Sequence, residues 1–197
     1  MKNKFLKSLM VVLAVVLMTS CGKVPQAKID SVNAAIEAAR VAEAPIYLSV
    51  EFAAVQDSMK AIDATIEIQK SKLFKRFGPV NVKLDSTLAT VNRLAINAVI
   101  KKAEVKAKVE SLLTETKSIL IEDNALIKKA PRGKEGAVVL ESIKSDIVTI
   151  EATIIETETL FANGTFMDAL DKITAANTKA VSIKNELTEA IAKVKGK

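Results

Sequence analysis

Few residues in this chain are able to carry out covalent or acid–base chemistry. Its 197 residues include one cysteine, Cys21, and no histidine. Because histidine is the commonest general base and metal ligand at neutral pH, Ser-His-Asp, Cys-His and histidine- or cysteine-ligated zinc sites are excluded. Carboxylates remain, and we interpret Glu151, Glu156 and Glu158 as a solvated helix face rather than a catalytic group. We predict no catalytic residue, no metal and no cofactor, and a protein that is not an enzyme.

The residues before Cys21 have the order of a secretory signal. Three lysines make the first seven residues positive, residues 9–18 form an unbroken apolar run, and Thr19 and Ser20 are small. The apolar run is far shorter than the roughly 20 residues that a transmembrane helix needs. We therefore predict that residues 1–20 target the chain and are removed.

Leu17-Met18-Thr19-Ser20-Cys21 resembles the lipobox of bacterial lipoproteins, with methionine at a position where leucine is commonest. The resemblance implies that the Cys21 thiol receives a diacylglycerol and that the new amino terminus is acylated. Each buried methylene contributes about 0.8 kcal/mol, so two or three acyl chains anchor durably. The alternative is an ordinary signal peptide with an incidental cysteine. We predict lipid attachment at Cys21, with residues 21–26 as the tether.

The predicted address is the bacterial cell envelope. The family's inner-membrane retention signal is typically an aspartate after the lipidated cysteine, whereas this chain has Gly22. This favours the periplasmic side of the outer membrane over the inner membrane or the cell surface. Removal of the signal also lowers the net charge from +6 to +3, with 26 basic and 23 acidic residues. That balance argues against a nucleic-acid binder, which usually carries a basic stripe.

The rest of the chain has the periodicity of long helices. One apolar stripe recurs at alternating four- and three-residue spacing between residues 84 and 119, which places its members on one helix face. We predict an all-α fold, an elongated antiparallel bundle or coiled-coil hairpin of four to five helices forming one domain over residues 27–197. The predicted helices span about 27–44, 46–77, 80–130, 137–162 and 165–195, and the stripe is made of Leu84, Leu88, Val91, Ala95, Ala98, Lys102, Val105, Val109, Leu112, Thr116 and Ile119.

The predicted topology follows from segment lengths. Residues 26–77, with a kink or a fresh helix start at Pro45, match residues 80–130 in length. Their pairing as one long hairpin predicts that Cys21 lies at the end opposite Gly78. The two shorter helices should then cover the membrane-proximal half and make a four-helix bundle there. Lys102 and Thr116, which are polar residues within the stripe, are interpreted as setting the register of packing.

A basic cluster surrounds the predicted turn at Gly78. Its cationic side chains flank aromatic and aliphatic residues, so they could bind an acidic partner such as a wall polymer, lipid headgroups of a facing membrane or an acidic protein. The alternative is that the phenylalanines only cap the hairpin while the lysines keep it soluble. The candidate residues are Lys70, Lys72, Phe74, Lys75, Arg76, Phe77 and Lys83.

These features favour a membrane-anchored, non-enzymatic protein with a structural, adaptor or assembly role in the envelope. The alternative is a periplasmic holdase or a carrier of lipid or small molecules. The predicted partners are membrane lipid through acylated Cys21 and an envelope protein or polymer. Homo-oligomerisation is a further prediction, because part of a long hairpin would have few internal partners.

Overall fold

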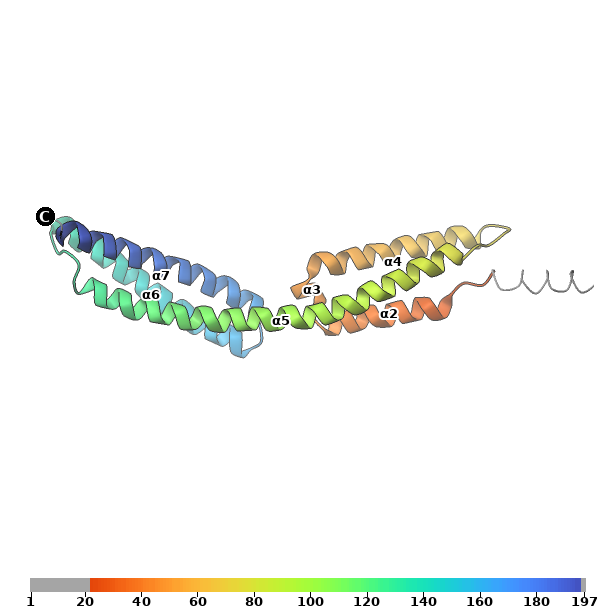
Figure 1. The fold of residues 1–197 in the computed structure, drawn as a ribbon, viewed down its shortest axis with the longest axis horizontal. Helices are drawn as coiled ribbons and strands as arrows, with labels where there is room; N and C mark the ends of the chain where they lie inside the picture. The colour runs from red at the N-terminus through yellow and green to blue at the C-terminus, as the bar shows by residue number, and fades with distance from the viewer. Residues whose placement is uncertain (1–21, 196–197) are drawn as a thin grey trace, which may run out of the picture. The chain divides into compact units, whose positions relative to one another are not determined.

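The computed structural model describes residues 22–195, and Cys21 and the predicted signal peptide lie outside these residues. The described chain is all-helical and contains no strand, which confirms the predicted all-α class. Its helices, in order, are α2 (Gln26–Val41), α3 (Ala44–Tyr47), α4 (Ser49–Lys70), α5 (Gly78–Ile127), α6 (Lys134–Ala162) and α7 (Phe166–Lys195) (Figure 1). Within residues 22–195, no helix is both long and apolar enough to cross a membrane.

The chain packs as two compact units that divide between Lys101 and Lys102, within α5. The first unit contains α2, α3, α4 and the first part of α5, and the second contains the rest of α5 with α6 and α7. Each unit has its own aliphatic core. The sequence had predicted one bundle over residues 27–197, and the structure instead gives two separate cores that use the same long helix.

The first unit is a three-helix bundle in which the chain reverses between α2 and α4. Glu43 adopts a left-handed conformation at φ 61°, and Pro45 lies at the start of the short helix α3. At this turn the Arg40 guanidinium lies 5.4 Å from the centre of the Phe52 ring. At the other end of α2, the Lys28 ammonium lies 2.6 Å from the Asp85 carboxylate of α5. Helices α2 and α5 are therefore parallel, with α4 antiparallel to both.

This reversal corrects the predicted topology. A straight run over residues 26–77 would have placed the start of the first helix opposite Gly78, whereas the ion pair between Lys28 and Asp85 places it beside the first turns of α5. The break at Pro45 was predicted as a kink or a fresh start, and the structure shows that the chain turns back there. Helices α6 and α7 consequently pack with the second part of α5 alone, as three helices instead of the predicted four.

The second unit is also a three-helix bundle. Lys117 of α5 pairs with Glu158 of α6 at 2.5 Å, and Lys179 of α7 pairs with Asp146 of α6 at 2.6 Å. These pairs make α6 antiparallel to its two neighbours. The turn between α6 and α7 uses Gly164 at φ 79°, where a side chain would be strained. The predicted end of α6 at about residue 162 is thus confirmed.

Candidate functional site

The candidate site is the turn that joins α4 to α5, which we call the α4–α5 tip and define as residues 70–77 together with Lys83. Helix α4 ends at Lys70, seven residues earlier than predicted. The following turn is held by backbone contacts back to α4 and by the Gln69 side chain, whose Oε1 accepts a hydrogen bond from the Arg76 N–H at 3.3 Å. The tip is therefore an ordered turn and not a continuation of the helix.

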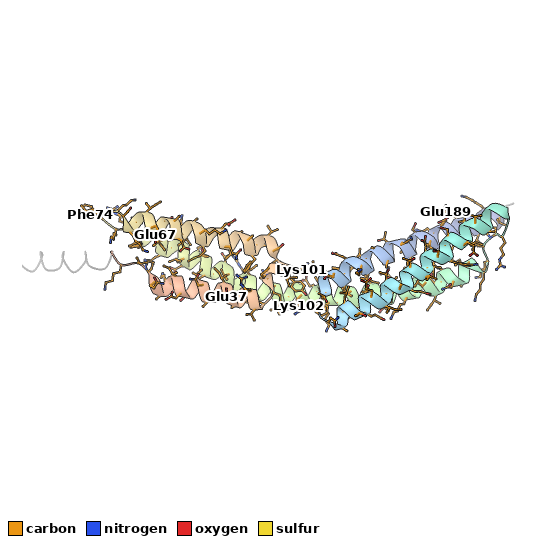
Figure 2. The ribbon with its side chains drawn as sticks, turned by 180° about the vertical axis from the view of Figure 1, so that it is seen from behind. Glu37, Glu67, Phe74, Lys101, Lys102 and Glu189 are labelled. Carbon is orange, nitrogen blue, oxygen red and sulfur yellow. The ribbon has the colours of Figure 1, made fainter. Side chains whose placement is uncertain are left out.

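The two phenylalanines of the tip have opposite environments. Phe77 retains 2 % exposure and belongs to the core of the first unit together with Ile66, Val80 and Leu84. Phe74 is 79 % exposed and Leu73 is 91 % exposed, although both lie within the helix predicted over residues 46–77. Figure 2 shows Phe74 at the end of this unit, directed away from the helices. Phe77 thus caps the bundle as the alternative interpretation expected, but Phe74 does not.

The tip is positively charged, and most of its charge is uncompensated. From residue 67 to residue 83 the chain carries five basic residues and one acidic residue, Glu67. Glu67 already pairs with Lys70 at 2.7 Å. Among the described residues, no carboxylate pairs with Lys72, Lys75 or Arg76, all of which are exposed. The structure therefore brings all the predicted tip cations to one turn and leaves only Phe77 out of the exposed set.

The start of α2 lies beside this tip, which was not predicted from the sequence. Val24, two residues before α2, is partly buried against the core of the first unit, and its carbonyl accepts a hydrogen bond from the Gln26 N–H at 2.8 Å. The described chain therefore enters the bundle at the same end as the α4–α5 turn (Figure 1). Gly22, the first residue that the structure describes, therefore belongs to the same end of the first unit as the tip.

A second feature is a cavity in the second unit, with a volume of about 470 Å³. Apolar side chains from α6 and α7 form its floor, including Val139, Leu140 and Leu187, and the chain at Pro131 borders it. Glu186, Glu189 and Lys193 of α7 also line it, and Glu189 is labelled in Figure 2. The volume falls within the range of roughly 300–1,000 Å³ typical of small-molecule sites.

The interior of the second unit contains one ionisable side chain that the sequence analysis missed. Asp123 of α5 has no exposed surface, and neither carboxylate oxygen has a hydrogen-bond partner. Burial raises the pKa of Asp123 to about 6, although the charge of Lys184 acts in the opposite direction. Lys184 itself bonds to Glu122, and this hydrogen bond raises the pKa of the Lys184 ammonium. The burial of Asp123 could have been predicted from the sequence, because Asp123 follows Ile119 by four residues and so continues the apolar stripe.

The polar stripe residues and two of the three candidate carboxylates have structural contacts. Thr116 is fully buried and accepts a hydrogen bond from Asn177 of α7 at 3.1 Å, while the Lys102 ammonium lies 5.9 Å from the centre of the Phe166 ring. Glu158 pairs with Lys117 at 2.5 Å, and Glu156 pairs with Lys172 at 2.8 Å. Glu151 is exposed on α6. No group of three or more potential metal ligands occurs within the described part of the chain.

Comparisons with protein families, with curated proteins and with solved structures find no match to this chain.

Proposed function

We propose that this protein is a lipid-anchored, non-enzymatic protein of the bacterial cell envelope, in which two helical bundles serve a structural, adaptor or assembly role. The observation that carries this proposal is the segment Leu17 to Cys21, which resembles a lipobox and contains the only cysteine of the chain. The address that follows is the periplasmic side of the outer membrane. An envelope protein or polymer is the proposed partner of the bundles.

A non-enzymatic role is supported by the scarcity of side chains that could act as a general base or a nucleophile. Both bundles are filled by aliphatic side chains with a few phenylalanines, and the chain has no histidine for general base catalysis. The surface carboxylates Glu156 and Glu158 are already paired with lysines of neighbouring helices. Exposed pairs of this kind contribute about 0–1 kcal/mol each, which suits a role in orienting helices.

Replacing Cys21 with serine in the full-length chain is expected to abolish lipid attachment, because only the thiol forms the thioether to diacylglycerol. In cells fed radiolabelled palmitate, the unaltered protein should carry label and partition into the detergent phase. Cys21→Ser should carry none. Ser20→Ala is the matched control, since it keeps a small residue before the cysteine and should label normally. Equal labelling of Cys21→Ser and the unaltered protein would contradict the proposal.

A second candidate function is a carrier of small apolar molecules, and the cavity beside Leu187 is the observation that favours it. Ala190 lines this cavity and is half-buried, whereas Ala175 of the same helix is exposed. If the cavity binds ligands, Ala190→Phe should reduce the fluorescence enhancement of Nile red several-fold, since the added ring takes up space that the ligand would occupy in the cavity of about 470 Å³. Ala175→Phe should leave the enhancement unchanged. Equal enhancement for both variants would argue against the carrier role.

A further inference from the structure

We propose that the α4–α5 tip docks on the membrane that holds the acylated Cys21, with Leu73 and Phe74 inserted into the lipid and the surrounding cations bound to anionic headgroups. This inference rests on the proposed lipid anchor and adds a second, non-covalent contact to it. The partner is a lipid surface, and residues 70–76 are the part of the tip that would contact it, because Phe77 is buried.

The start of α2 and the tip lie at the same end of the first unit (Figure 1). Helices α2 and α5 run in parallel, and the contact of 2.6 Å between Lys28 and Asp85 fixes their register. Helix α2 begins at Gln26, two residues before Lys28, and α5 begins at Gly78, seven residues before Asp85. The non-helical residues 22–25 extend from α2 towards the start of α5, and Val24 among them packs against the core of the first unit (Figure 1). Cys21 immediately precedes these residues in the sequence. A lipid attached there brings the bilayer surface to the tip, because the short segment before α2 is held by the packing of Val24.

The apex of the turn is apolar. Leu73 and Phe74 are 91 % and 79 % exposed, whereas most turns carry Gly, Asn, Asp, Ser or Pro at such positions. Their exposure does not result from a loose turn, because the turn is held at its end by Phe77. The Phe77 ring is buried in the core and is only 2 % exposed. Two adjacent apolar side chains, held away from the bundle, have the arrangement of a small membrane-inserting loop, in which apolar side chains reach the boundary between headgroups and acyl chains.

The tip also carries positive charge that no neighbouring carboxylate within residues 22–195 neutralises. Lys72, Lys75 and Arg76 border the two apolar residues, and no carboxylate of the described chain pairs with them. Basic residues close to an anionic leaflet contribute about a fivefold gain in binding each, which corresponds to about 1 kcal/mol. Lys23, in the segment that follows Cys21, is also exposed at this end. The combination of an apolar apex with a cationic border is complementary to an anionic bilayer.

The position of the anchor also distinguishes lipid from other acidic partners. A protein or a polymer bound at the apex would have to occupy the space next to the lipidated residue, where the bilayer itself lies. The tether is too short to lift the tip away, because residues 21–26 reach at most about 18 Å when fully extended, and Val24 is already packed against the bundle.

The single cysteine allows a direct test on the mature, lipidated full chain. Because the Cys21 thiol is acylated, a second cysteine introduced at Leu73 is the only reactive thiol and can be labelled with the environment-sensitive fluorophore NBD. Val50 is the matched control position, since it is 77 % exposed in the same unit but lies at the start of α4, about 30 Å along the helix from the tip. Both proteins are reconstituted into vesicles containing phosphatidylglycerol and phosphatidylcholine.

The expected result is a blue-shifted emission for the label at Leu73→Cys, quenching by spin-labelled lipid, and at least fivefold protection from a water-soluble quencher. The label at Val50→Cys should remain fully accessible to water. The triple variant Lys72→Glu, Lys75→Glu and Arg76→Glu, or vesicles of phosphatidylcholine alone, should remove most of the protection at position 73.

Two outcomes would overturn the inference. One is equal accessibility of the labels at positions 73 and 50 on anionic vesicles. The other is protection at position 73 without quenching by the spin-labelled lipid, which would indicate contact with protein. Failure of the lipid anchor is distinguishable, because the protein would then not float with the vesicles at all, whichever position carried the label.

Discussion

Replacing Phe77 with alanine is expected to lower the free energy of unfolding of the first bundle by about 3–5 kcal/mol. The ring is almost fully buried, at 2 % exposure, and belongs to the same core as Ile66 and Leu84. Truncation of a buried phenylalanine removes its transfer free energy and leaves a cavity, and the two effects together account for this magnitude. Urea unfolding of the chain from Gly22 to Lys197, followed by far-ultraviolet circular dichroism, measures the loss.

Phe74→Ala is the matched control, since it makes the same chemical change three residues away. At 79 % exposure, Phe74 contributes little packing, and its removal should change the free energy of unfolding by less than about 0.5 kcal/mol. Similar losses for the two variants would show that Phe74 also packs against the bundle. Such a result would remove the exposed apolar apex on which the docking proposal depends.

Replacing Asp123 with asparagine should increase the stability of the second bundle by about 2–3 kcal/mol at pH 7.5. The carboxylate is buried without a hydrogen-bond partner, and its pKa is about 6 in the folded protein against an ordinary value of 3.8. One pKa unit corresponds to about 1.4 kcal/mol of differential stabilisation. At pH 7.5 the charge is present in both states, and the folded state bears the cost of its burial.

The same shift determines how stability varies with pH. Because the folded state binds the proton of Asp123 more tightly than the unfolded state, this group's contribution to stability is fully present below pH 3.8 and is lost as pH rises through 6. Urea unfolding at a series of pH values between 4 and 8 should show this decline, and Asp123→Asn should not show it. Glu115→Gln, an exposed change on the same helix, should retain it. Lower stability of Asp123→Asn at pH 7.5 would contradict the prediction.

The helical fold could be predicted because packing in these bundles depends on periodicity. Each of the eleven stripe residues from Leu84 to Ile119 is buried or half-buried, as the alternating spacing required. Val99, the residue after Ala98 of the stripe, is 58 % exposed. Periodicity shows which residues share a helix face, but it does not show on which side of that face a neighbouring helix lies.

The reversal after α2 and the end of α4 were not predictable in the same way. Pro45 indicated a break, but the direction of the chain beyond it depends on Glu43 at φ 61°, a conformation for which glycine or asparagine is the usual signal. Leu73 lies within the helix predicted over residues 46–77, but α4 ends at Lys70, and Leu73 is exposed while Phe77 enters the core. The basic residues of the tip therefore lie together near the α4–α5 turn, whereas the start of the first helix, predicted opposite Gly78, lies beside the first turns of α5.

The sharing of α5 by two cores has a consequence for how the chain folds as it emerges from synthesis or export. Amino-terminal segments appear first, so α2, α4 and the first part of α5 can bury Phe77 and Ile62 before any residue of α6 is available. The remaining turns of α5 then present Val105, Val109 and Leu112 to solvent until α6 and α7 arrive. This interval is the one in which a chaperone would find an apolar helix face to bind.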